Sequence, residues 1–293
     1  MKPSSFTYHR FDDLADVTEA LTRLGDDAKL LAGGQSLVPM MNMRLARFEH
    51  LIDIARIHEL KTIERSQNHV VIGAAVRHCV VERDAIIESD VRLLHASAPL
   101  IGHFQIRSRG TIGGSLAHAD PAAEQPAVAV ALDALFDVVS SRGSRTIAAE
   151  DFFIGLWATS MDPDEVLRAV SFPVWSGRIG VGIAEFSRRH GDFAIAGAAV
   201  QIEVSEHDEV TRSAMSLFGM SGTPHRARSA EAHVTGHQVA NVDAIELGRL
   251  AVADITDVTE DSNVSTSYRR DVGAAMLAEA WRQAVADTRR ETR

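Results

Sequence analysis

"KLLAGGQSLVPMMNMRLARFEHLIDI", residues 29–54, places a Gly-Gly-Gln-Ser turn directly after a short apolar segment. A second Gly-Gly pair leads into a small hydroxyl residue in "RGTIGGSLAHADPAAEQP", residues 109–126. Glycine lacks Cβ, so its backbone approaches a ligand closely and can point successive N–H groups into one concavity, which suits phosphate oxygens. The hydrogen-bonding side chains beside the two pairs are Gln35, Ser36, Thr111 and Ser115. The two turns together suit one diphosphate, and the alternative is that each pair is only a tight turn.

The composition is that of an ordinary globular chain. Its 293 residues exceed what one core usually holds, so two or three packed subdomains are expected. The 45% hydrophobic and 24% charged fractions argue against disorder and fibrous folds. A net charge of -10 leaves no global basic surface, which makes nucleic acid a poor partner. No apolar run is long enough for an integral membrane segment and no apolar stretch follows Lys2, so we expect a cytoplasmic protein.

Cysteine and histidine usage limits the metal sites that the chain can build. Cys79 is the only cysteine, which excludes an intramolecular disulfide, a four-cysteine iron–sulfur site and a cysteine-rich zinc site. The histidines lack the spacing and the neighbouring acids of a metal centre. We therefore predict no metal-ligating residue here, and any metal cluster must lie on another chain.

Hydrophobic periodicity predicts a mixture of strands and helices. Strand-like stretches cover residues 28–33, 50–57, 69–76, 135–141, 165–174, 193–204 and 212–220, the last two as an antiparallel pair. Helical periodicity covers residues 14–24, 79–102, 122–135, a short piece near 151–156, 242–255 and 268–290. Glycine and proline punctuate "SFPVWSGRIGVG", residues 171–182, which predicts a domain boundary near residue 175.

Three other sequence stretches suggest a functional site different from the paired turns. There is no G-x-x-x-x-G-K-[ST] loop, and "GVGIAE" from Gly180 has Glu185 where a dinucleotide motif needs its third glycine. "GGSLA" from Gly113 approaches the G-x-S-x-G motif, so a serine hydrolase with Ser115 as nucleophile is the alternative from another class, although Ala117 replaces the last glycine. "SLFGMSGTPHRAR", residues 216–228, is either an interface loop or an ordinary surface turn.

The two glycine stretches together resemble the FAD-binding medium subunit of the molybdenum hydroxylase family, which includes the flavoproteins of carbon monoxide, xanthine and nicotine-type dehydrogenases. The resemblance extends to "EDFFIGLWATSMDPDEVLRAVSFP", "FSRRHGDFAIAGAAVQIEV" and "STSYRRDVGAAMLAEA", and so covers nearly the whole chain. It implies an α+β fold with a two-lobed FAD-binding domain of the vanillyl-alcohol-oxidase (PCMH) type over residues 1–176. A smaller C-terminal domain of antiparallel strands and helices would occupy residues 177–293.

The resemblance also implies which residues contact FAD. The first pyrophosphate loop would be Leu30, Leu31, Ala32, Gly33, Gly34, Gln35, Ser36 and Leu37, and the second Thr111, Ile112, Gly113, Gly114 and Ser115. Glu124 stands at a position near the flavin or its ribityl chain, where a carboxylate accepts a hydrogen bond. Its alternative role is a charge at a helix N-terminus. Ile101 and Leu167 would supply apolar contacts, and their alternative role is core packing.

The function implied by the resemblance is electron transfer. An FAD subunit would take electrons from 2Fe–2S clusters on a small subunit, beside a large molybdopterin-binding subunit that oxidises the substrate. The external acceptor would be a quinone, a cytochrome, NAD or O₂. No catalytic side chain is expected, because the cofactor supplies the redox chemistry. The alternatives are a standalone flavin oxidoreductase of the same fold and a cofactor-free assembly scaffold.

Overall fold

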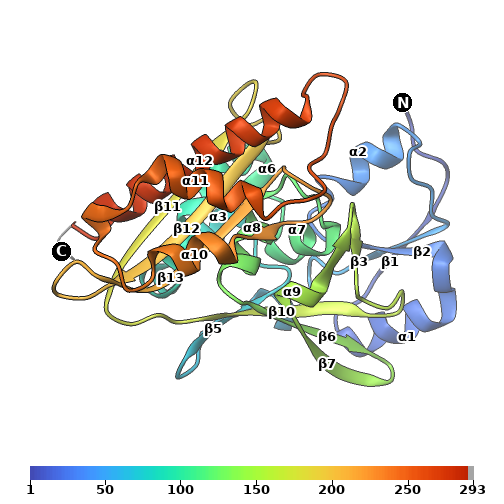
Figure 1. Cartoon of the computed structure of the whole chain (residues 1–293). Helices are drawn as coiled ribbons and strands as arrows, with labels where there is room; N and C mark the ends of the chain where they lie inside the picture. Colours follow the sequence, from blue (N-terminus) through green and yellow to red (C-terminus); the bar gives the residue numbers. More distant parts are fainter. Residues whose placement is uncertain (290–293) are drawn as a thin grey trace.

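The computed structural model describes residues 1–289 and comprises an N-terminal part and a C-terminal part. Figure 1 shows the N-terminal strands at the right and along the lower edge, and the C-terminal sheet with its two long helices at the upper left. Those helices are α11 (Ala244–Ala253) and α12 (Thr266–Asp287). Shorter helical segments include α2 (Leu37–Asn42), α6 (Phe104–Arg107), α10 (Arg228–Val234) and the 3₁₀ turns η1 (Gly25–Asp27), η2 (Glu59–Lys61), η3 (Ala98–Leu100) and η4 (Val239–Asn241).

The first sheet is parallel and has the order β1 (Thr7–Arg10), β3 (His50–Asp53), β2 (Ala28–Leu31). Helix α1 (Leu14–Leu24) packs beside it, and its start and end match the prediction. The Asp13 side chain caps the helix by accepting from the N–H of Asp16 at 2.9 Å, and Gly25 ends it with a φ of 57°. Because the strands are parallel, the first glycine turn, directly after β2, emerges at their common carboxyl edge.

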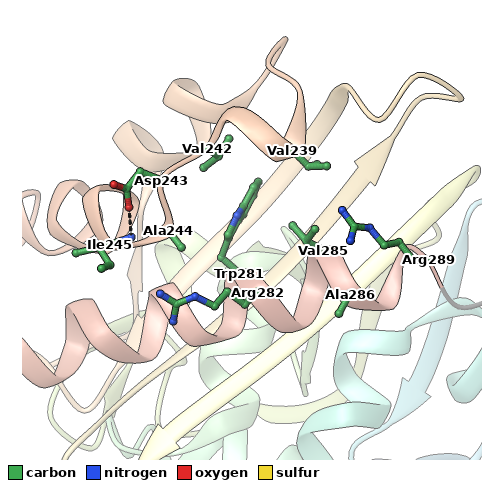
Figure 2. Close-up of a pocket in the computed structure, with 10 residues that line it drawn as sticks. All are labelled: Val239, Val242, Asp243, Ala244, Ile245, Trp281, Arg282, Val285, Ala286 and Arg289. Carbon is green, nitrogen blue, oxygen red and sulfur yellow. Dashed lines mark hydrogen bonds between the residues drawn. The ribbon is translucent and has the colours of Figure 1, made fainter.

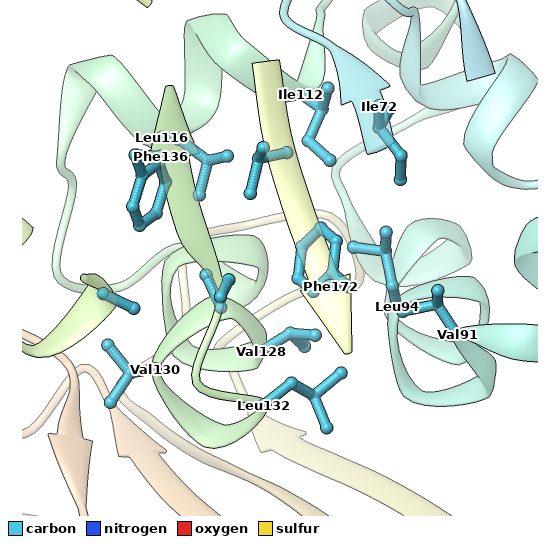
Figure 3. Close-up of a cluster of buried hydrophobic side chains, with 14 of the residues drawn as sticks. Ile72, Val91, Leu94, Ile112, Leu116, Val128, Val130, Leu132, Phe136 and Phe172 are labelled. Carbon is cyan, nitrogen blue, oxygen red and sulfur yellow. The ribbon is translucent and has the colours of Figure 1, made fainter. Parts of the chain in front are cut away.

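The second sheet is antiparallel and contains the large core of the protein. Its order is β4 (Ile63–Arg65), β5 (His69–Gly73), β10 (Val166–Pro173), β6 (Leu135–Ser140), β7 (Gly143–Ala148). Its core partners are α5 (Arg92–Ser97), α7 (Ile112–His118) and α8 (Glu124–Ala131). Figure 3 shows Phe172 of the sheet facing Val128 of α8 and Leu94 of α5, and Phe136 belongs to the same cluster. This core fixes α7 and α8, and the second glycine stretch lies at the start of α7.

The C-terminal sheet is antiparallel, with the order β11 (Arg178–Phe186), β12 (Ala196–Val204), β13 (Val210–Phe218), β14 (His225–Arg226). The predicted antiparallel pairing of residues 193–204 with 212–220 is confirmed as β12 with β13. Helices α12 and α10 contact one face, with α11 packed against both of them, and α5 and α8 contact the other face. Ala199 and Ala214 of this sheet belong to the same core as Phe136, so the two parts share an apolar interface.

Two helical predictions were wrong in detail. Residues 79–102 form α3 (His78–Val81), α4 (Ala85–Asp90) and α5 rather than one helix, because the Asp84 side chain accepts from the N–H groups of Ile86 and Ile87 and starts a new helix. The piece near 151–156 is α9 (Ala149–Phe152), followed by a hairpin of β8 (Phe153–Gly155) and β9 (Ala158–Thr159). The predicted end of the last helix, Arg290, lies outside the described residues.

Strand β11 was missed, because its glycines were interpreted as punctuation. A Cβ on Gly180 would lie 2.0 Å from the carbonyl oxygen of Ala284, and one on Gly182 would lie 2.0 Å from that of Ala280. Both carbonyls belong to α12. The glycines therefore permit a helix to lie directly on a strand, and they are not the residues of a turn.

Candidate functional site

The first glycine loop, residues 32–36, joins β2 to α2 and presents free backbone donors. Gly34 has a φ of 72°, in the region that glycine adopts without strain. Within residues 1–289, the N–H groups of Gly33, Gly34, Gln35 and Ser36 donate to no protein acceptor. All four residues are partly exposed. Successive free donors at a partly open turn are the arrangement that binds phosphate oxygens.

The second glycine stretch is built differently from the expectation. Gly113 and Gly114 lie in the first turn of α7, and neither has a positive φ. The hydroxyl of Thr111 caps this helix by accepting from the N–H of Gly114 at 3.1 Å, and the N–H of Gly113 donates to the carbonyl of Ala74. The interpretation of this stretch as a second row of free N–H groups is therefore wrong. Its side-chain donors are the hydroxyls of Thr111 and Ser115.

The two glycine stretches lie side by side. A Cβ on Gly33 would lie 2.4 Å from the carbonyl oxygen of Arg109 and 2.7 Å from the Cα of Gly110. A Cβ on Gly114 would lie 3.8 Å from the Cβ of Ala32. The fold thus brings together segments nearly eighty residues apart at the carboxyl edge of the parallel sheet. The contact with Arg109 and Gly110 had no sequence signal beyond the glycines.

The other residues predicted to contact FAD differ in how far their side chains are buried. Ile101 is partly exposed, in the loop after η3, where its carbonyl accepts from Nη1 of Arg107 at 3.2 Å. Leu167 and Ile112 are 4% and 0% exposed and belong to the large core. Their side chains have the core-packing role, and a contact of either with FAD stays a prediction. Leu30, Leu31 and Leu37 are partly exposed around the first loop.

Glu124 begins α8 and lies at the junction between the two parts of the protein. The pKa of Glu124 is raised to about 8, chiefly by burial and also by the negative charges of Glu185 and Asp120, while a hydrogen bond from its own backbone lowers it. Burial also raises the pKa of Glu185, on β11, to about 7. The charge of Glu185, which the sequence indicated only as a broken glycine motif, therefore acts on Glu124.

We expect Glu124→Gln to change how the stability of the FAD-free protein depends on pH. A carboxyl whose pKa is raised in the folded state contributes stability below its unfolded value of about 4.5, and this contribution is lost as pH rises toward about 8. At about pH 8 the loss is on the order of 2–4 kcal/mol, and a glutamine has no such loss. Urea unfolding at several pH values measures this loss of stability, with the exposed Glu206→Gln variant as control. Parallel pH curves for wild type and Glu124→Gln would contradict the expectation.

The segment at residues 216–228 is part of the same junction. The N–H of Gly219 donates to the carbonyl of Pro121 at 2.7 Å, and Met220 and Ser221 are 0% and 6% exposed. The prediction of an ordinary surface turn is therefore wrong, because this turn joins the C-terminal sheet to the segment before α8. Arg269 lies in "STSYRR", residues 265–270, which has the pattern S-x-x-Y-R-R; it donates to the carbonyls of Ile195 and Gly219 and to Asp261.

Two cavities lie away from the glycine loops. Figure 2 shows one of about 410 Å³ in the C-terminal part, where Trp281 of α12 points toward Val239 and Val242. The other, of about 530 Å³, lies between Phe153 of the hairpin and Arg226 of β14. Neither is lined by a residue of the two loops. The free donors of the first loop, rather than either cavity, locate the candidate site.

The hydrolase alternative does not fit the geometry. A nucleophile elbow holds its serine in a strained turn between strand and helix. Ser115 instead lies inside α7, where its N–H donates to the carbonyl of Thr111 at 3.0 Å. Across the described chain, no group of three His, Cys, Asp or Glu side chains is arranged to hold a metal ion. No helix within residues 1–289 is both long and apolar enough to cross a membrane.

Two family models match the chain. Residues 4–175 match the FAD binding domain in molybdopterin dehydrogenase, and residues 183–284 match the CO dehydrogenase flavoprotein C-terminal domain. The donors of the first loop and the hydroxyls of the second fit the diphosphate of such a cofactor. Together with the solved structures described next, these matches confirm the predicted fold class, a two-lobed FAD-binding domain followed by an antiparallel sheet with helices.

Curated and solved relatives agree with the family models. The 6-hydroxypseudooxynicotine dehydrogenase complex subunit alpha of Paenarthrobacter nicotinovorans is 38% identical, over 94% of this chain and 93% of its own. The carbon monoxide dehydrogenase medium chain of Afipia carboxidovorans is 36% identical, over 98% and 99%. A solved carbon monoxide dehydrogenase from Hydrogenophaga pseudoflava matches with a TM-score of 0.92 and 35% identity, over 98% of this chain and 99% of that chain. This chain therefore belongs to the family of FAD-binding subunits of the molybdenum hydroxylases, and it is an oxidoreductase subunit whose cofactor is FAD.

Proposed function

We propose that this chain is the electron-transfer subunit of a heterotrimeric molybdenum-dependent dehydrogenase. It receives electrons from 2Fe–2S clusters on a separate small subunit and passes them to an external acceptor, while a large molybdopterin-binding subunit oxidises the substrate. Bound FAD supplies the redox chemistry, because flavins exchange electrons singly and in pairs. Residues 1–176 form the FAD-binding domain in this proposal, and residues 177–293 the C-terminal flavoprotein domain. A cytoplasmic location stays a prediction.

The observation that supports this proposal is that the two glycine loops lie side by side. Four free N–H groups of the first loop lie beside the hydroxyls of Thr111 and Ser115, so the pair grips a diphosphate without a lysine. The only cysteine, Cys79, rules out a four-cysteine cluster in this chain. Relatives of similar length are a medium chain and a subunit of a dehydrogenase complex. These observations support a division of labour in which the iron–sulfur and molybdenum centres lie on other chains.

The test is to purify the chain from its native source and to identify its cofactor and its partners. We expect a yellow protein that releases FAD rather than FMN on heating, because a diphosphate bridge occurs only in FAD. We also expect two further polypeptides, one with iron and sulfide and one with molybdenum, to copurify. Recovery of FMN alone, or of no flavin from native material, would contradict the two-loop site.

Activity measurements separate the proposal from a standalone flavin oxidoreductase. The isolated chain with FAD should not oxidise a heterocycle, an aldehyde or carbon monoxide, whereas the copurified complex should oxidise its substrate and reduce one of the candidate acceptors. Mixing the reduced complex with a quinone, a cytochrome, NAD or O₂ identifies that acceptor. Bleaching of the flavin by an organic substrate in the isolated chain would favour the standalone enzyme.

A further inference from the structure

Helix α2, directly after the first glycine loop, is little covered by the rest of the fold. It makes no extensive contact with another helix or strand of the described chain, and Figure 1 shows it at the upper right, apart from the other helices. Met41 is the buried residue of this helix. The N–H groups of Arg44 and Leu45 donate to the carbonyls of Met41 and Met40 at 3.0 and 2.9 Å. The helix and the turn after it are thus held by their own hydrogen bonds, while much of their surface stays open.

Large apolar side chains are exposed on this segment. Val38, Met43 and Leu45 are 42%, 53% and 71% exposed. Single exposed apolar residues are normal on a protein surface, whereas several in one short segment indicate contact with another molecule. Arg44 has a φ of 59°, which residues other than glycine rarely adopt, and such strained residues are concentrated at binding sites. We call residues 37–47 the α2 surface.

The α2 surface is positively charged in an acidic protein. It contains Arg44 and Arg47 and no Asp or Glu, whereas the whole chain has a net charge of -10. Both arginines are exposed, and within residues 1–289 neither side chain has a hydrogen bond or an ion pair. Methionine and arginine are enriched at protein interfaces. Apolar side chains beside unpaired cations fit a partner surface that is apolar at its centre and acidic at its rim.

The α2 surface touches the loop that carries the free N–H donors. The N–H of Val38 donates to the carbonyl of Gly34 at 3.1 Å, and a Cβ on Gly34 would lie 3.1 Å from Cγ2 of Val38. The N–H of Met40 donates to the carbonyl of Ser36 at 3.1 Å. A partner that covers the exposed side of Val38 therefore lies one side chain away from the backbone of this loop.

We propose that the α2 surface is the docking site of the iron–sulfur subunit. This rests on the proposed function, because the partner is the small subunit of that complex. Electrons reach the FAD from the chain that carries the 2Fe–2S clusters, so that chain has to lie against the FAD site. The molybdopterin-binding subunit passes its electrons through those clusters and needs no contact there. The small subunit meets the α2 surface with apolar side chains and with acidic groups opposite the two arginines.

The experiment uses the complex purified through a tag on this chain, with iron, molybdenum and FAD measured in each preparation. Leu45→Glu puts a charge into the apolar contact, so iron per FAD should fall about tenfold or more, the scale of a central interface residue. The FAD content and the thermal melt should stay at wild-type values, because Leu45 is 71% exposed and lies outside the glycine loop. Met43→Glu is the second variant, with the same expected result. Ile245→Glu, at a residue of α11 that is 53% exposed, is the matched control and should keep the wild-type iron content.

A salt series tests the electrostatic part of the contact. Iron per FAD in the wild-type complex should fall as the salt concentration of the wash rises, because salt screens the attraction between exposed charges. Arg47→Gln should lose its iron at a lower salt concentration than wild type. Arg282→Gln, at an arginine of α12 that is 54% exposed, should follow wild type.

The outcomes separate this proposal from the proposed function. Leu45→Glu and Met43→Glu complexes with wild-type iron per FAD would overturn the docking site and leave the proposed function intact. Loss of molybdenum with the iron retained would show that another partner covers the α2 surface, which would also overturn the proposal. A wild-type preparation with FAD and no iron would overturn the proposed function, and this proposal with it.

Discussion

A Gly33→Ala variant is expected to purify without FAD. The added Cβ would lie 2.4 Å from the carbonyl oxygen of Arg109 and 2.7 Å from the Cα of Gly110. Both atoms belong to backbone, so no side chain can rotate away, and the two loops must separate. A diphosphate gripped from two sides would then lose one side. Overpacking of this kind costs about 1–3 kcal/mol of stability, which a chain of this size survives.

The measurement is flavin absorbance per protein, together with circular dichroism and a thermal melt with FAD added back. Gly155→Ala is the matched control, because a Cβ there meets nothing nearer than the Cβ of Ala158 at 4.0 Å. Gly114→Ala should have a smaller effect, since its Cβ would contact the Thr111 hydroxyl at 2.8 Å and the Ala32 side chain at 3.8 Å, with no backbone atom nearby. A folded Gly33→Ala protein with full FAD would show that the contact between the loops is not needed for binding.

An Arg269→Ala variant should lose about 2–4 kcal/mol of unfolding free energy, since two carbonyls lose their donor. Arg269 is 5% exposed, and its guanidinium donates to the carbonyls of Ile195 and Gly219 and to Asp261. Its removal leaves two strand-end carbonyls without their donor, and buried acceptors without partners are costly. Gly219 also donates to Pro121, so the segment before Glu124 should loosen as well.

Urea unfolding of the purified chain measures this loss, and the FAD content of the same sample measures the effect on the site. Arg282→Ala is the control on the same helix, because Arg282 is 54% exposed and pairs only with Glu279 at 3.7 Å. Exposed pairs of this kind contribute under about 1 kcal/mol. An Arg269→Ala protein as stable as Arg282→Ala would mean that the S-x-x-Y-R-R motif has another role.

Local chemistry in the sequence was sufficient for the helix over residues 14–24 and for the antiparallel pairing of β12 with β13, and it singled out the two glycine stretches that the fold brings side by side. A capping side chain, alternating apolar residues and adjacent glycines each act within a few residues, so their patterns can be recognised in the sequence. The family resemblance added the cofactor and the order of the two domains.

Tertiary packing decided the rest, because the deciding contacts join distant segments. Gly180 and Gly182 mark a strand only because the carbonyls of α12 lie against them, and Gly33 must be glycine because the backbone at Arg109 lies there. The N–H groups of Gly113 and Gly114 in the second stretch donate to Ala74 and Thr111, so the row of free N–H donors lies in the first loop. Glu185 disrupted a motif in the sequence, and only the tertiary fold brings its charge close enough to raise the pKa of Glu124.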